Sequence, residues 1–134
     1  MQGSSDFDRS IFINCPFDAD YLPLLQALLF LLLECGLTPR IASETSDSGE
    51  VRIDKIKRMI RESRYSVHDI SRIETTECLP RFNMPFEFGI DVGSREYGQG
   101  ELRTKRSLIL DKEPYRYQKF LSDIAGQDIK SHKG

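Results

Sequence analysis

Short β-prone runs alternate with longer helical stretches along the first third of the chain. The apolar run at 11–14 predicts a strand that stops at Cys15-Pro16. The leucine-rich segment from Tyr21 to Cys35 predicts a helix, with Gly36 as the residue that ends it. This segment is apolar almost all round, so we expect it to be buried on every side or to use a second face against a partner. Residues 37–43 then predict a second strand.

The rest of the chain repeats this alternation of strand and helix. Residues 50–63 form an amphipathic pattern in which Ile53, Ile56 and Ile60 share one helix face. Further strands are predicted at 65–70 and 107–110, and further helices from Pro85 onward and at 115–122. Alternation at this spacing predicts an α/β fold: a doubly wound parallel sheet of four to five strands with helices on both faces.

The length of 134 residues fits a single domain, 1–134. Its end, residues 126–134, is polar and carries no further helical pattern. Because a doubly wound sheet is normally closed by one more helix, we expect the domain to be cut short at its C-terminus.

The charge of the chain narrows the class of partner. With 19 basic and 21 acidic side chains the net charge is −2, which excludes a broadly basic nucleic-acid binder. The charge is uneven, since residues 1–50 hold eight acidic and two basic side chains, whereas Arg52 to Arg64 hold six basic and two acidic ones. Such a basic stretch is typical of a solvated helix face, and a phosphate-, partner- or nucleic-acid-docking surface is the alternative.

Cysteine usage and hydropathy point to a reducing compartment. The three cysteines form no C-x-x-C pair, and neither histidine stands at metal-ligand spacing from them, so we expect no disulfide framework and no metal. The N-terminal residues are acidic rather than signal-like, and the most apolar stretch has 15 residues. A membrane-spanning helix needs about 20 residues. We therefore expect a cytoplasmic protein with no membrane partner.

Candidate site residues follow from the fold class. In an open parallel sheet, ligands bind beyond the carboxyl ends of the strands. The loops there carry Asn14, Cys15, Pro16, Phe17, Asp69, Ser71, Phe82, Asn83 and Glu87. A carboxylate such as Glu87, in the first turn of a helix beside aromatic residues, can stabilise an oxocarbenium-like sugar or attack C1′. Phe17, Phe82 or Phe86 offers a surface on which a base could stack.

Each of these residues also has a purely structural interpretation. Glu87 can be a first-turn acid favoured by the helix dipole, and Asp69 can cap the following turn. His68 can be a satisfied strand residue, and Cys15 a buried small residue rather than a nucleophile. No P-loop occurs and no G-x-G-x-x-G follows the first strand, which weakens kinase and dinucleotide oxidoreductase hypotheses.

Two motifs carry a family resemblance. Tyr65-Ser-Val-His-Asp-Ile-Ser71, followed by Asn83-Met-Pro-Phe-Glu-Phe-Gly89, resembles the nucleoside 2-deoxyribosyltransferases, in which a D-x-S strand end precedes an N-x-N-x-x-x-E-L-G-like helix start. The same layout is similar to bacterial Toll/interleukin-1-receptor (TIR) domains, which have a flavodoxin-like architecture. The whole chain also resembles a group of bacterial proteins that repeat FINCPFD, HDIS, PRFNMPFE and SDIAGQDI.

The resemblance implies roles for several positions. Glu87 matches the catalytic carboxylate, Asp69 the strand-end acid that organises the site, and Asn83 the first Asn of the helix-start motif. The loop from Asn14 to Phe17 would line the ribose or phosphate side. Phe88 replaces the usual Leu, and Met84-Pro85 replace the usual spacer, so the choice of substrate can differ.

We therefore expect N-glycosidic bond cleavage of a nucleotide or nucleoside, with NAD hydrolysis by a TIR-like domain first and no cofactor beyond the substrate. The alternative is a nucleotide-sensing or protein-interaction module without turnover. TIR-like domains commonly assemble, so a homo-oligomer is expected, and nucleic acid is the least favoured partner.

Overall fold

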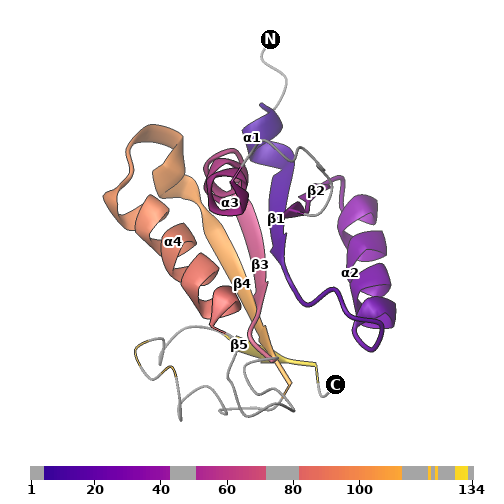
Figure 1. Cartoon of the computed structure of the whole chain (residues 1–134). Helices are drawn as coiled ribbons and strands as arrows, with labels where there is room; N and C mark the ends of the chain where they lie inside the picture. Colours follow the sequence, from indigo (N-terminus) through magenta and orange to yellow (C-terminus); the bar gives the residue numbers. More distant parts are fainter. Residues whose placement is uncertain are drawn as a thin grey trace.

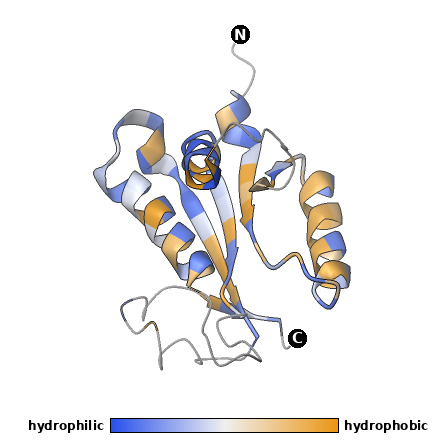
Figure 2. Ribbon diagram, in the orientation of Figure 1, coloured by the Kyte–Doolittle hydropathy of each residue, from blue (hydrophilic) through white to orange (hydrophobic). Residues whose placement is uncertain are grey.

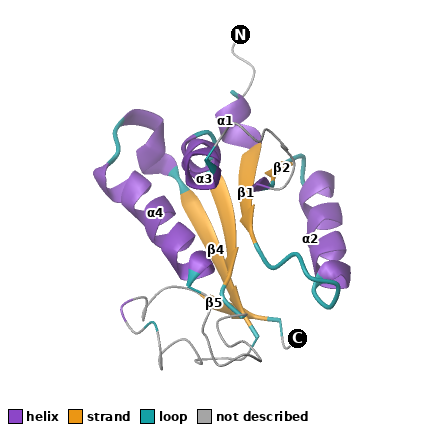
Figure 3. Ribbon diagram, in the orientation of Figure 1, coloured by secondary structure: helices purple, strands orange, loops and turns teal. Residues whose placement is uncertain are grey.

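The computed structural model describes residues 5–42, 51–71, 82–112, 121, 123 and 129–132 and has an α/β fold with one parallel sheet (Figures 1 and 3). Within these ranges the strands are β1 Ser10–Asn14, β2 Thr38–Arg40, β3 Tyr65–Asp69, β4 Arg106–Asp111 and β5 Ile129–Ser131. The helices are α1 Asp6–Arg9, α2 Leu22–Glu34, α3 Arg52–Arg61, α4 Asn83–Tyr97 and the 3-10 helix η2 Gly100–Thr104.

The sheet order is β2-β1-β3-β4-β5, and every neighbouring pair is parallel. This is the flavodoxin-like order, and it confirms the doubly wound parallel sheet predicted from the alternation of elements. The order reverses at β1, so right-handed crossovers place α2 on one face and both α3 and α4 on the other (Figure 1).

Side-chain alternation along the strands divides the core between these faces. On β1, Ile11 and Ile13 belong to the cluster under α2, whereas Phe12 packs with Ile56 and Met59 of α3. A third cluster, formed by Ile70, Phe88 and Ile109, lies under α4. All five residues of β1 are buried, as expected for a strand covered on both faces.

Helix α2 is not buried on every side. Only Leu25 and Leu32 of α2 are buried, while Phe30 and Leu33 are 68% and 61% exposed. Figure 2 shows the contrast with α3, which is polar on its outer side. Gly36 follows the helix with φ of 79°, the left-handed conformation predicted for the residue that ends it. No helix in the described part of the chain is both long and apolar enough to cross a membrane.

Several element boundaries differ from the sequence prediction. Helix α4 begins at Asn83, two residues before Pro85, because the first turn of a helix has no internal acceptors for its N–H groups and tolerates proline. The polar segment at 126–134 contains a fifth strand, β5, which pairs with β4. Helix α1 was not expected, and the helix predicted at 115–122 lies outside the described residues apart from Leu121.

Candidate functional site

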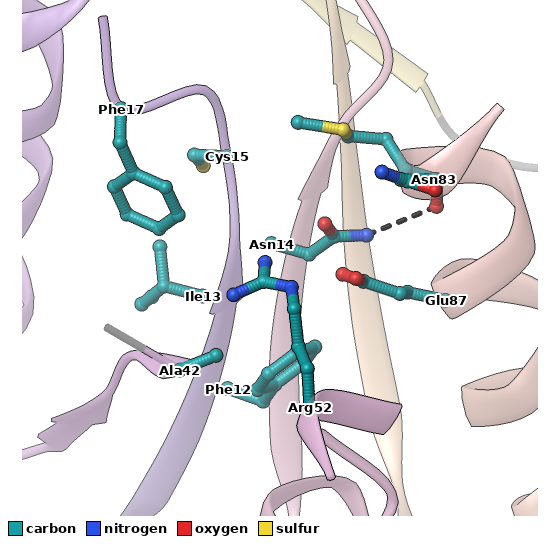
Figure 4. A pocket seen from close by; sticks show the side chains of 10 residues that line it. Phe12, Ile13, Asn14, Cys15, Phe17, Ala42, Arg52, Asn83 and Glu87 are labelled. Atoms are coloured by element: carbon teal, nitrogen blue, oxygen red, sulfur yellow. Dashed lines mark hydrogen bonds between the residues drawn. The ribbon is translucent and has the colours of Figure 1, made fainter. Parts of the chain in front are cut away.

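A small cleft of about 60 Å³ opens at the carboxyl end of β1, against the N-terminus of α4 (Figure 4). It is lined by Phe12, Ile13, Asn14, Cys15, Phe17, Ala42, Arg52, Asn83, Met84 and Glu87. Strand β1 ends here because Pro16 has no N–H with which to continue the ladder. The cleft thus unites five of the residues predicted from the sequence, from two loops that lie about 70 residues apart.

Glu87 is the ionisable acid in this cleft. Its side chain reaches in from α4, and Arg52 reaches in from the start of α3, so that both charged ends point toward Asn14 (Figure 4). Glu87 is 7% exposed, and its carboxylate oxygens are not among the fully buried polar atoms of the described residues that lack a partner, so they face the open cleft. Burial raises the pKa of Glu87, and the positive charge of Arg52 partly opposes this. A carboxyl group in a cleft whose pKa is raised by burial is a frequent feature of functional sites.

Asn14 is held in one orientation by two neighbours. Its Nδ2 lies 3.0 Å from the carbonyl oxygen of Met84 and 2.9 Å from Nδ1 of His68. A carbonyl oxygen can only accept, so the amide nitrogen must face it and donates to Nδ1 of His68 as well. The Asn14 amide oxygen is thereby left as an acceptor in the cleft.

The same contacts orient the ring of His68. Its Nδ1 lies 2.9 Å from Nδ2 of Asn14, and its Nε2 lies 2.8 Å from Oδ2 of Asp91. His68 is fully buried, which confirms the interpretation of this residue as a satisfied strand residue. It supports the cleft from below without lining it.

Asp91 is the centre of a buried polar cluster one helical turn beyond Glu87. Its carboxylate accepts from His68, from Ser66, and from Ser107 at 2.9 Å, and Nζ of Lys105 lies 3.1 Å from Oδ1. Burial alone raises the pKa of Asp91, but the His68 hydrogen bond and the Lys105 charge outweigh it and hold the pKa well below its usual range. The cluster therefore holds Asp91 ionised.

Asp69 lies elsewhere. It is fully buried and shares the α2 face of β3 with Val67, and it does not line the cleft. Its Oδ2 accepts from Tyr21 Oη at 2.5 Å and lies 3.0 Å from His132 Nε2, and its Oδ1 accepts from Ser71 N at 2.8 Å. The last contact is the turn cap that sequence reasoning kept as the alternative for Asp69.

Of the other residues predicted for the site, some line the cleft and others do not. Cys15 lines the cleft, but burial raises the pKa of its thiol to about 12, so it is a thiol rather than a thiolate at neutral pH. Phe17 lines the cleft and is 47% exposed. Pro16, Ser71 and Phe82 do not line it.

Sequence reasoning missed two contributors to the site. Arg52 was counted only as part of a basic stretch, and nothing in that stretch singled out its first residue. Asp91 had a usable signal, because its spacing of four from Glu87 places both carboxylates on one face of α4.

No model of a protein family matches the chain, and no curated protein matches it either.

Proposed function

We propose that the protein cleaves the N-glycosidic bond of a nucleotide or nucleoside, and that NAD is its substrate, as in TIR-like domains. One observation carries this proposal: Glu87, a largely buried residue whose pKa is raised by burial, lines the cleft at the carboxyl end of a parallel sheet. Perturbed acids of this kind in a cleft are frequent at functional sites.

The proposed reaction uses the charge of that carboxylate. As the bond between C1′ and the base nitrogen breaks, the electron pair leaves with the base and positive charge develops on the sugar. Ionised Glu87 stabilises that charge, and the oxygen of a water molecule then bonds to C1′ and releases a proton. Asn14 and Asn83 offer amide groups to the ribose hydroxyls, and Phe17 offers an aromatic face to the base.

The size of the cleft limits how the substrate enters. A volume of about 60 Å³ is far below the roughly 300–1,000 Å³ of pockets that enclose a small molecule. Only the sugar end of a nucleotide would approach Glu87, and the remainder would lie over the open side beside Phe17. Arg52 stands where it can pair with a phosphate.

The test is base release from NAD and, separately, from deoxynucleosides. We expect wild type to release nicotinamide and Glu87→Gln to lose at least about 100-fold in rate, the lower range for a positioned charged group. The control is Glu96→Gln, the same substitution at an exposed position of the same helix. Full release by Glu87→Gln would refute the proposal.

A second candidate function is nucleotide sensing without turnover. It is favoured by the position of Asp69, which leaves Glu87 as the one carboxylate among the described residues lining the cleft. Calorimetry distinguishes the two functions, since binding of NAD with no product formed supports the sensor.

A further inference from the structure

A second pocket lies at the opposite end of the strands from the cleft, where β3 and β4 begin. It has a volume of about 430 Å³ and is lined by Arg64, Arg95, Arg103, Thr104, Lys105 and Arg106. Arg64 directly precedes β3, Arg106 begins β4, and Arg95 lies in the last turn of α4. We call it the arginine pocket. Its volume lies within the range of about 300–1,000 Å³ that is typical of small-molecule sites.

Lys105 forms the floor of the arginine pocket, and its ammonium group is already engaged by the protein. Its Nζ donates to the carbonyl oxygens of Ile60, at 2.7 Å, and Ser63, and it pairs with Asp91. Lys105 is only 3% exposed, so these contacts hold its ammonium group on the protein side of the pocket. A ligand would therefore bind to the guanidinium groups above it.

The guanidinium charges are only partly balanced. Arg64 lies 3.7 Å from Asp8, and Arg95 lies 3.3 Å from Glu96. Arg103 and Arg106 are exposed and have no acidic partner among the described residues.

We propose that the arginine pocket binds a compact oligophosphate, either free or as the phosphate chain of a small molecule. Planar guanidinium groups bind phosphate oxygens in pairs, which suits a ligand with several such oxygens. Asp8 lies against Arg64, Glu96 against Arg95, and Glu101 stands two residues before Arg103 in η2. A compact anion fits this arrangement better than an extended nucleic-acid backbone, which the flanking acids would repel.

The test is calorimetry with inorganic tripolyphosphate at fixed ionic strength. We expect one site per chain in wild type and a Kd raised roughly tenfold or more for each guanidinium lost in Arg103→Gln/Arg106→Gln. The matched control is Lys57→Gln/Arg61→Gln, which removes the same charge from exposed positions of α3 outside the pocket. The control is expected to bind as wild type does.

Three outcomes overturn the proposal. The first is absence of binding, or equal weakening in the control variant, which would mean general electrostatic attraction. The second is equal affinity for citrate, which would remove the preference for phosphate. The third is tighter, strongly salt-dependent binding of a single-stranded oligonucleotide, which would assign the pocket to nucleic acid. The proposed reaction at Glu87 is separate, since Glu87→Gln is expected to bind tripolyphosphate unchanged.

Discussion

The buried pair between Asp91 and Lys105 allows a quantitative test of what holds the sheet and α4 together. The two side chains are 1% and 2% exposed, and Nζ lies 3.1 Å from Oδ1. Replacing Lys105 by Met leaves a buried carboxylate and two carbonyl oxygens, those of Ile60 and Ser63, without their charged donor. Breaking a buried ion pair in this way costs about 3–5 kcal/mol.

The value expected for Lys105→Met is at the lower end of that range, about 3 kcal/mol, since Asp91 retains its hydrogen bonds from Ser66, His68 and Ser107. Asp91→Asn is expected to cost about as much, because it leaves the Lys105 charge buried and unpaired. In the double variant neither charge remains. Its loss should therefore fall short of the sum of the two single losses by about 1–3 kcal/mol.

The assay is urea unfolding at neutral pH of the wild type, both single variants and the double variant, with comparable m-values as the condition for two-state treatment. The control cycle uses Lys57 and Asp54, a pair 3.2 Å apart whose side chains are 49% and 59% exposed. An exposed pair of this kind couples by no more than about 0.5 kcal/mol. Equal coupling in the two cycles would refute the reasoning.

A pH series adds an independent check on Asp91. Its folded-state pKa is depressed below the ordinary value of 3.8, so its contribution to the free energy of unfolding is fully present above that value. That contribution is lost as the pH falls below 3.8 toward the depressed pKa. Wild type should therefore lose stability more steeply than Asp91→Asn in this acidic range, and parallel curves would contradict an ionised Asp91.

Three further predictions concern activity, helix packing and assembly. Burial raises the pKa of Glu87, and the positive charge of Arg52 opposes this rise. Arg52→Gln is therefore expected to move the acidic limb of the pH–rate profile of base release to higher pH. An unshifted limb would contradict the pairing. Gly89 has no described atom within 4 Å of where a Cβ would lie, so Gly89→Ala should stabilise α4 by about 0.5–1 kcal/mol in urea unfolding, and a loss of stability would contradict this open space. We propose that the exposed apolar side of α2 mediates a homo-oligomer. Light scattering at high concentration should show a dimer or larger, and Phe30→Glu/Leu33→Glu should reduce it to a monomer. A monomeric wild type would exclude this interface.

The order of elements could be predicted from the sequence because short β-prone segments alternate with longer helical patterns, and β1 reads as an apolar run that is buried on both faces. Helix ends were less predictable where a residue type fits several helix positions. Pro85 is an example, because the first turn of a helix accepts proline at more than one position. Strand β5 has only three residues, Ile129–Ser131, and is defined by its pairing with β4 rather than by any pattern of its own. Such an element depends on contacts far away in the sequence.

In the candidate site, the fold directs only some residues of a sequence motif toward the cleft. His68 and Asp69 are consecutive on β3, so their side chains face opposite sides of the sheet. The strand order places α4 on the His68 side, and Glu87 on α4 therefore lies above His68, whereas Asp69 faces Tyr21. We expected Asp69 in the same site as Glu87, because we did not apply the alternation of side chains along β3. The position of Arg52 beside Glu87 was not predictable in this way, because it depends on where α3 begins relative to the end of β1.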